Sequence, residues 1–249
     1  MTNTAPVFIV GAPRSGTTIL RDTLRLDDRF LCPEETHFFR WNEAYGSTYY
    51  RDLVAHNATL LHHRELDGVL PDEFNALLDR CEHKGQLWTG YMQLLAQKRD
   101  LQATVIPVDK TPQHVYALEL IHHYFPQARF VHIVRNPLNV VSSLMKGRQF
   151  DAQDLVGALN FWLEPIELME RFRARYSSQC AEVSYELFAE DPDAVMTGLY
   201  RFLNIAKPTA LDTSAVHPAP DRHSGFLGAE HIDYIVQRAA AAGRVVEPV

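Results

Sequence analysis

Short apolar runs alternate with longer amphipathic segments along most of this chain. The runs indicate buried strands at residues 7–10, 29–32, 104–108, 129–134 and 181–183. Continuous apolar runs of this length are typical of parallel strands that helices cover on both faces. The pattern therefore predicts the α/β class, with a parallel sheet flanked by helices.

Apolar residues at helical spacing mark the segments between the strands. Helices are expected after the first strand and from Pro137, and also at 48–62, 71–81, 88–99, 112–125, 151–176, 192–203 and 229–242. Residues 36–100 are expected to form a helical cap region within a single domain, 1–249. Residues 205–227 predict a long loop because they are rich in Pro, Ala, Ser, Asp and Gly. Pro107 predicts a strand that is bent or at a sheet edge, since proline lacks an N–H donor.

A glycine-containing loop follows the first strand. The apolar run Val7–Val10 ends at Gly11, and Pro-Arg-Ser-Gly-Thr-Thr occupies residues 13–18, just before a helical pattern. Such a loop points successive backbone N–H groups toward one place and sets a helix N-terminus behind it. Strand, loop and helix together predict an anion site, and phosphate is the commonest ligand of such sites.

The position of its basic residue distinguishes this loop from a Walker A loop. Gly11 and Gly16 have the Walker A spacing, but Thr17 follows Gly16 where a Walker A loop carries lysine. The basic residue is Arg14, inside the loop. A plain glycine turn is the alternative interpretation, and the predicted strand and helix on either side argue against it.

Ionisable residues also follow later predicted strands. Glu34 and Glu35 come after the second strand, and Asp109 and Lys110 come after the third. Ligands of an open parallel sheet gather at the carboxyl ends of its strands, so we expect Glu35 to lie beside the same ligand as Arg14. We interpret Glu34 as an acidic residue at a helix start.

Composition and charge mainly exclude classes of function and location. The 249 residues are 46% hydrophobic and 22% charged, as in an ordinary globular chain. The net charge of −7 argues against a nucleic-acid partner. The cysteines show no paired spacing. We find no signal peptide and no apolar run long enough for a transmembrane segment. A cytoplasmic location is therefore expected.

The His62–His63 and His122–His123 pairs lack chelating spacing, and we expect no metal site.

Several segments together resemble the sulfotransferases that use 3′-phosphoadenosine 5′-phosphosulfate (PAPS). The PRSGTT segment resembles their 5′-phosphosulfate loop. Residues 32–39, CPEETHFF, combine the EET of tyrosylprotein sulfotransferases with the E-x-HFF of heparan-type enzymes. DKTP at 109–112 resembles their lysine segment, and Arg135 and Ser143 have the spacing of their 3′-phosphate motif. These segments occur in the family's order along most of the chain.

The resemblance implies a reaction and a role for each matching residue. It implies a P-loop-like fold, transfer of a sulfuryl group from PAPS to a hydroxyl or an amine, release of 3′-phosphoadenosine 5′-phosphate (PAP), and no metal requirement. Glu35 would take the acceptor proton, while Arg14 and Lys110 would neutralise charge on the transferring group. Arg14 and Lys110 should also keep Glu35 ionised. The residues implied to hold the nucleotide are Gly11, Pro13, Arg14, Ser15, Gly16, Thr17, Thr18, Arg135 and Ser143.

Two later residues are also implied to contact the nucleotide. Tyr185, in a segment resembling the family's YE-x-L, would contact the adenine; a packed surface tyrosine is the alternative. Arg222 would belong to a loop that closes over the nucleotide, although DRHSGFLG departs from the usual Arg-Lys-Gly form.

Other functions remain open from the sequence. A P-loop nucleotide kinase or NTPase would bind Mg²⁺ through Asp109, although its Walker lysine is missing. A nucleotide-binding protein without chemistry would not need Glu35 and Lys110. The acceptor is expected to be a small molecule, a peptide or a lipid-like alcohol, and the oligomeric state is not indicated. If Glu35 is not the base, His37 or His114 is the next candidate.

Overall fold

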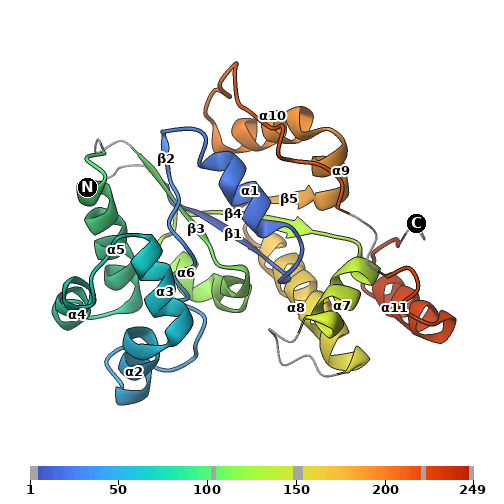
Figure 1. Ribbon diagram of the computed structural model, residues 1–249, viewed down its shortest axis with the longest axis horizontal. Coiled ribbons are helices and arrows are strands. Elements are labelled where there is room, and N and C mark those ends of the chain that lie inside the picture. The colour runs from blue at the N-terminus through green and yellow to red at the C-terminus, as the bar shows by residue number, and fades with distance from the viewer. Residues whose placement is uncertain (1–4, 102–104, 148–153, 220–222, 247–249) are drawn as a thin grey trace.

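The computed structural model describes residues 5–101, 105–147, 154–219 and 223–246 (Figure 1). Within these ranges a five-stranded parallel sheet has the strand order β2-β3-β1-β4-β5. The strands are β1 (Val7–Gly11), β2 (Phe30–Leu31), β3 (Ile106–Lys110), β4 (Arg129–Val134) and β5 (Cys180–Ser184). The predicted α/β class with a parallel sheet is confirmed.

The central strand β1 is buried on both faces. Val7 and Ile9 join an apolar cluster with Leu20 of helix α1 (Thr17–Leu24), whereas Phe8 joins the cluster on the opposite face. Successive side chains of a strand point to opposite faces, so an unbroken apolar run supplies both clusters.

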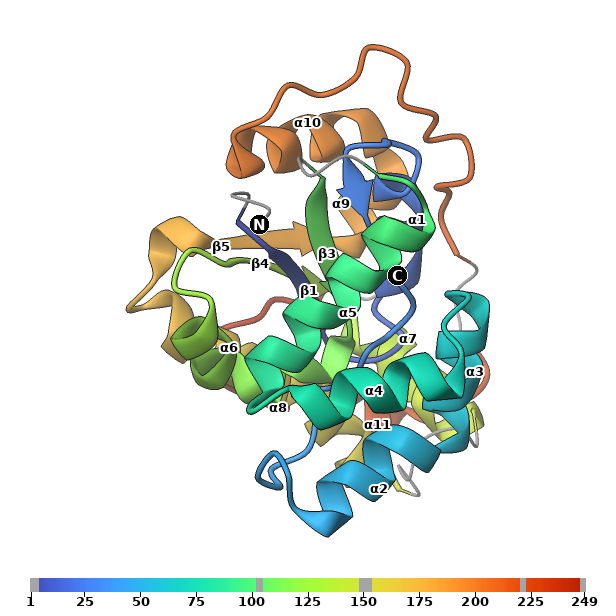
Figure 2. The ribbon, with the colours of Figure 1, turned by 90° about the vertical axis from the view of Figure 1, so that its left-hand side faces the viewer.

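Helices cover both faces of the sheet, as Figures 1 and 2 show. One face packs against α1, α9 (Tyr185–Glu190) and α10 (Pro192–Leu203). The other face packs against α5 (Lys84–Lys98), α6 (Leu118–Tyr124) and the C-terminal half of α8 (Leu155–Arg173). Two short 3₁₀ helices, η1 (Pro112–Ala117) and η2 (Ser177–Gln179), follow β3 and precede β5.

The predicted cap region is helical, with boundaries that local capping explains. It contains α2 (Thr48–His56), α3 (Ala58–Leu66), α4 (Pro71–Arg80) and α5. The helix predicted at 48–62 is divided because the Asn57 side chain accepts the Thr59 and Leu60 N–H groups and starts a new helix. Apolar residues of α4 and α5 enter the same cluster as Phe8 of β1, so the cap packs directly on the sheet.

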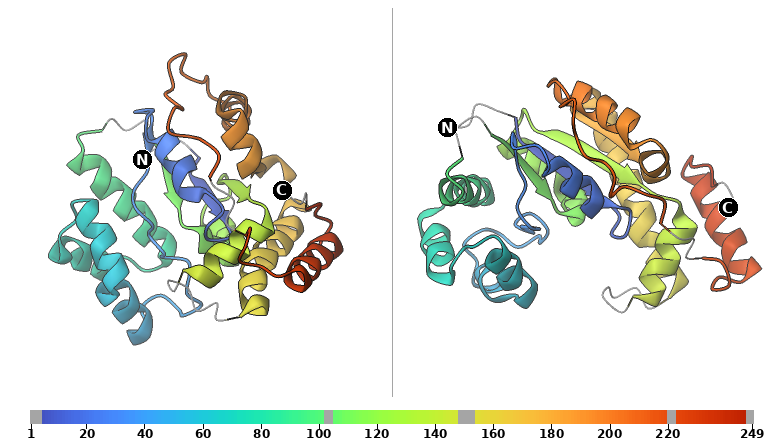
Figure 3. Two further views of the ribbon diagram at one scale, coloured as in Figure 1. Left: turned by 45° about the vertical axis from the view of Figure 1, so that its right-hand side comes forward. Right: turned by 45° about the horizontal axis from the view of Figure 1, so that its top comes forward.

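A third apolar cluster joins α7 (Pro137–Lys146), the N-terminal half of α8 and α11 (Ala229–Ala241). Helix α11 lies beside α7, at the opposite end of the molecule from α2–α5, in both views of Figure 3. The predicted loop at 205–227 contains no helix or strand in the part that the structure describes.

Pro107 predicted a strand that is bent or at a sheet edge, and the edge alternative is wrong because β3 lies between β2 and β1. Pairing with β1 begins at Val108, one residue after the proline, and Ile106 N–H donates to Arg29 O at 2.7 Å on the β2 side. The missing N–H therefore falls where the ladder with β1 has not yet begun. In the described ranges, no helix is long and apolar enough to cross a membrane.

Candidate active site

Two glycines allow the tight loop after β1. Gly11 has a φ of 146°, and a Cβ at this position would lie 2.6 Å from the Ile133 carbonyl oxygen. Gly16 has a φ of 92° at the start of α1, and a Cβ there would lie 2.3 Å from Cδ2 of Tyr185. A side chain at either position would clash and would strain the backbone. The loop therefore passes closely between β4 and α9.

The loop offers polar groups to an anion. Ser15 is fully buried, and its Oγ has no hydrogen-bond partner among the described residues. No described side chain caps α1, so the first N–H groups of this helix can bind a ligand. These features fit a phosphate-type group, as the sequence predicts.

The nucleotide-binding residues predicted in three separate segments lie together beside the loop. Arg14 Nε donates to Ser143 Oγ of α7 at 3.0 Å, and Arg135 Nη1 donates to Arg14 O at 3.3 Å. The Arg135 guanidinium carbon lies 4.4 Å from the ring centroid of Tyr185, and the Trp162 indole donates to Arg135 O at 2.8 Å. Parallel strands bring these residues together because β1 and β4 end at the same edge of the sheet.

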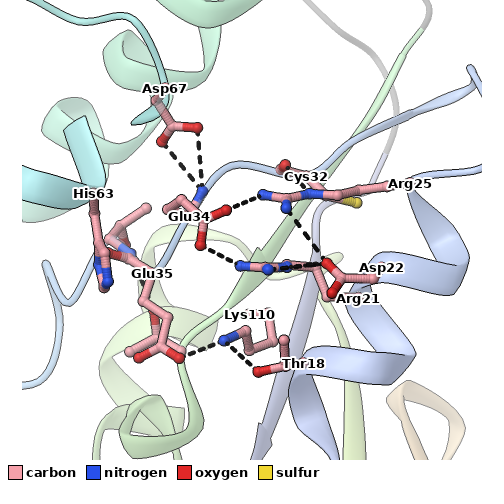
Figure 4. A network of polar contacts seen from close by, with 12 residues as sticks. Thr18, Arg21, Asp22, Arg25, Cys32, Glu34, Glu35, His63, Asp67 and Lys110 are labelled. Atoms are coloured by element: carbon pink, nitrogen blue, oxygen red, sulfur yellow. Dashed lines mark hydrogen bonds and ion pairs between the residues drawn. The ribbon is translucent and has the colours of Figure 1, made fainter. Parts of the chain in front are cut away.

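Glu35 lies on the other side of the loop, where it pairs with Lys110 (Figure 4). Lys110 Nζ donates to Glu35 Oε1 and also to Thr18 Oγ1, the latter at 3.3 Å. His37 Nε2 lies 3.1 Å from the second carboxylate oxygen of Glu35. One ammonium therefore links the candidate base to the first turn of α1.

The neighbours of Glu35 control its ionisation. Burial by itself raises the carboxyl pKa, but the hydrogen bond from His37 and the charge of Lys110 outweigh burial and lower the pKa of Glu35 to about 2. Burial lowers the pKa of Lys110, and the charge of Glu35 offsets part of this effect. Glu35 is consequently ionised at neutral pH, as a proton acceptor must be.

The structure corrects the prediction that Arg14 helps Lys110 to keep Glu35 ionised. The Arg14 guanidinium donates to Ser143, and the second group acting on Glu35 is His37. Sequence reasoning named His37 only as a substitute base and missed this contact. The available signal was the Glu-x-His spacing, but the contact also depends on the left-handed backbone of His37, with a φ of 57°.

Glu34 is not a helix-start residue, because the next helix begins only at Thr48. Its carboxylate accepts from Arg21 Nη1 at 2.5 Å and from Arg25 Nη2 at 2.9 Å. Arg21 is buried in α1 and needs an anionic partner, which the chain leaving β2 supplies.

Asp109 has a structural environment that does not suit a metal ligand. It is fully buried and accepts hydrogen bonds from Thr36 Oγ1 at 2.6 Å, Trp88 Nε1 at 2.8 Å and Thr111 Oγ1 at 2.8 Å. Burial raises the pKa of Asp109. A carboxylate with its oxygens already occupied in this way offers no open site for Mg²⁺, so the kinase interpretation loses its metal ligand.

A pocket of about 660 Å³ joins the loop, the Glu35 segment and the cap. It is lined by Pro13, Arg14, Thr17, Thr18, Glu35, His37, Arg40, Trp41, Asn57, Thr59, Leu60, His63, Pro112, Gln113 and Phe161.

His114, the other candidate for the base, is fully buried. Its Nε2 accepts Phe39 N–H at 3.3 Å, and burial lowers its pKa. Arg222 lies outside the described residues.

Neither histidine pair forms a metal centre in the part of the chain that the structure describes, where no group of three or more His, Cys, Asp or Glu residues could hold a metal ion. His63 Nδ1 instead lies 3.0 Å from the Glu35 carbonyl oxygen, and His122 Nε2 lies 3.2 Å from Gln179 Oε1.

Comparison with known proteins connects this geometry to one family. Residues 6–209 match the family model described as the sulfotransferase family. The chain is 26% identical over 170 residues to the omega-hydroxy-beta-dihydromenaquinone-9 sulfotransferase of Mycobacterium bovis, covering 55% of this chain and 44% of that protein. It is 27% identical over 203 residues to protein-tyrosine sulfotransferase 1 of Danio rerio, covering 80% of this chain and 53% of that protein. The chain thus spans about half the length of these relatives.

Solved structures show the same fold. The sulfotransferase domain of the Synechococcus olefin synthase superimposes with a TM-score of 0.66 at 21% identity, covering 100% of this chain and 92% of that one. The sulfotransferase domain of the curacin biosynthetic pathway gives a TM-score of 0.64 at 18% identity, covering 99% of this chain and 100% of that one.

Proposed function

The chain belongs to the sulfotransferase family, and from this premise we propose that it transfers a sulfuryl group from PAPS to an acceptor hydroxyl, or to an amine. The products are PAP and a sulfated acceptor. The proposal extends to a single catalytic domain in which the cap helices contribute to the acceptor side of the pocket.

The observation that carries the proposal is the arrangement of Glu35, Lys110 and Thr18 beside the anion-binding loop. The ionised Glu35 carboxylate and Thr18 line one pocket with Arg14 of the loop, and the buried Lys110 ammonium bonds to both Glu35 and Thr18. A site that only binds a nucleotide would gain nothing from a carboxylate at this position, because the carboxylate would repel the anionic ligand.

In the proposed reaction, the acceptor oxygen attacks the sulfur while the bond from sulfur to the phosphate oxygen breaks. Glu35 accepts the proton of the acceptor hydroxyl. Lys110 and Arg14 stabilise the negative charge that accumulates on the transferring group and the departing phosphate. The charge therefore develops where the chain already gathers cationic side chains.

For recognition of the donor, the loop N–H groups and Ser15 would hold the 5′-phosphosulfate, while Arg135 and Ser143 would hold the 3′-phosphate. Arginine suits this role because its guanidinium can donate two hydrogen bonds to one phosphate. Tyr185, beside Arg135 and Gly16, is proposed to contact the adenine.

For the acceptor, the proposal is a small molecule, a peptide or a lipid-like molecule with a hydroxyl group. The named relatives above include one enzyme of a hydroxylated menaquinone and one of protein tyrosine. The pocket lining outside the loop combines aromatic and polar side chains, among them Trp41, Phe161 and Arg40, which suits an acceptor with both kinds of surface.

The reaction is tested by incubating the protein with labelled PAPS and a panel of hydroxyl and amine acceptors, followed by mass spectrometry. We expect a sulfated product that forms equally well in EDTA, because no step uses a divalent ion. A requirement for Mg²⁺, or phosphoryl transfer from ATP, would instead support the kinase interpretation.

The donor site is tested with Arg135→Ala. We expect the unmutated protein to bind PAP much more tightly than AMP, and the variant to lose most of this preference, since a hydrogen bond to a charged group contributes about 1.5–3 kcal/mol. Isothermal titration calorimetry with both nucleotides measures the difference. Equal affinities for PAP and AMP in the unmutated protein would contradict the assignment of the 3′-phosphate site.

A further inference from the structure

We infer that Glu34 is a positioning residue that holds Glu35 against the anion-binding loop, an inference that rests on the proposed role of Glu35 as the base. Figure 4 shows Glu34 between three charged side chains: Arg21 and Arg25 on one side and Asp67 on the other. None of these three residues is assigned a part in the reaction.

One face of α1 contacts Glu34 directly and is linked to Glu35 through Lys110. Thr18, Arg21 and Arg25 are three and then four residues apart, so they lie on the same side of the helix. Arg21 and Arg25 bind the Glu34 carboxylate, while Thr18 accepts from Lys110, which pairs with Glu35. The helix that begins in the anion-binding loop thereby sets the position of residues 34 and 35 relative to that loop.

The backbone of Glu34 is fixed from the cap side. Its backbone nitrogen donates to both carboxylate oxygens of Asp67, each at 3.2 Å, and Asp67 is the residue that directly follows α3. Asp67 is held in turn by Tyr91 Oη at 2.9 Å and by Arg99 Nη2 at 3.1 Å. Glu34 therefore joins α1 to the cap, and Glu35 is the next residue along the chain.

The charge of Glu34 is needed for this arrangement. Arg21 is 5% exposed, and its other carboxylate partner, Asp22, has a side chain that is 45% exposed. Burial alone would raise the pKa of Glu34, but Arg21 and Arg25 lower it, so the carboxylate is ionised. Removal of this charge leaves the buried Arg21 guanidinium without its short contact, and the segment at 33–37 loses its ion pairs with Arg21 and Arg25.

The test compares Glu34→Gln with Asp22→Asn, a matched control. Asp22 pairs with the same two arginines but lies on α1 itself, and no hydrogen bond or ion pair joins it to the described segment at 33–37. Hydrogen exchange with mass spectrometry follows the amides of residues 34–37, and calorimetry measures PAP binding. We expect exchange at least ten times faster in Glu34→Gln, unchanged exchange in Asp22→Asn, and an affinity for PAP that stays within threefold in both.

Turnover with the acceptor found in the PAPS screen provides the second readout. A misplaced base should lower kcat in Glu34→Gln by about 10–100-fold without changing the KM of PAPS, because a shift of about 1 Å costs on that order. Glu34→Asp keeps the charge and should recover part of kcat, which distinguishes positioning from general loss of structure. If circular dichroism shows that Glu34→Gln does not fold, Arg25→Met, which removes one of the two contacts, takes its place.

The outcomes separate this inference from the proposed function. An unmutated protein that neither binds PAP nor transfers sulfate contradicts the proposed function. An active unmutated protein, with Glu34→Gln equal to Asp22→Asn in exchange and in kcat, overturns the positioning role of Glu34.

Discussion

At the scale of single residues, the proposed chemistry depends on the charge of Glu35. The carboxylate lies between Lys110 and His37, and its pKa is lowered to about 2. A carboxylate so well stabilised is a weak base until another anion shares the charge of Lys110. In the proposed mechanism PAPS supplies that anion, so binding of the donor raises the pKa of Glu35 and strengthens it as a base.

Replacement of Glu35 is expected to affect the reaction more than binding. Glu35→Gln keeps the shape but removes the proton acceptor, so kcat should fall by about 10²–10⁴-fold. The affinity for PAP should change little, since other residues hold the nucleotide. Steady-state kinetics and calorimetry measure the two effects, with Glu65→Gln as a control because the Glu65 side chain is 81% exposed. Near-normal turnover of Glu35→Gln would mean that another group accepts the proton.

The hydrogen bond from His37 predicts a pH effect. This bond lowers the pKa of Glu35, so its removal raises that pKa and moves the loss of activity in acid to higher pH. Asparagine suits the test because it tolerates the left-handed backbone at position 37 but is too short to replace the ring. Between pH 5 and 7 Glu35 of the unmutated protein stays ionised, so we expect its titration to leave kcat/KM unchanged over this range. In His37→Asn, the fall of kcat/KM in acid should begin at a higher pH than in the unmutated protein. Identical profiles for the two proteins would exclude this role of His37.

At the scale of elements, α11 supports the helix that carries Ser143. It lies beyond residue 209, where the match to the sulfotransferase family model ends. Ile235 and Ala239 of α11 are fully buried with Leu138 and Val141 of α7. Arg244, just after α11, pairs with Glu182 of β5, with Nη1 2.6 Å from Oε1. The last helix thus packs against the helix that carries Ser143 and is tied to the edge strand β5.

We therefore expect Ile235→Ala to reduce the free energy of unfolding by about 2–5 kcal/mol, the usual cost of such a truncation in a packed core. Ile235→Val should cost about 0.5–1.5 kcal/mol because it removes one methylene group. Urea denaturation measures both values. Val245→Ala is the control, since Val245 is 92% exposed and should have little effect. A loss for Ile235→Ala as small as that of the control would show that α11 does not contribute to this core.

At the scale of the whole molecule, local charge and net charge point in opposite directions. The chain carries a net charge of −7, yet Arg14, Lys110 and Arg135 converge at one edge of the sheet. Parallel pairing causes this convergence, because β1, β3 and β4 all end at that edge. An acidic protein can therefore offer a cationic site to a nucleotide, because the potential in a pocket depends on the nearest groups.

The sequence alone determined the features that depend on neighbouring residues. The apolar run Val7–Val10, the glycine spacing and the helical pattern after Thr18 predicted the strand, loop and helix that the structure contains. The ends of the predicted strands also indicated that Glu35 would lie near Arg14, and both residues line one pocket. These predictions succeeded because side-chain periodicity and glycine conformations are local properties, and the edge of a parallel sheet is shared by its strands.

Only the tertiary structure decided which ionisable groups pair. Glu34 binds Arg21 and Arg25, Glu35 acquires His37 as a partner, and Asp109 turns into the core instead of facing the site. Side-chain spacing along the chain cannot specify these pairs, because a carboxylate interacts with whatever cation the packing of helices and strands brings within about 4 Å. Burial then sets the cost of leaving each charge unpaired, and burial exists only once the helices have packed on the sheet.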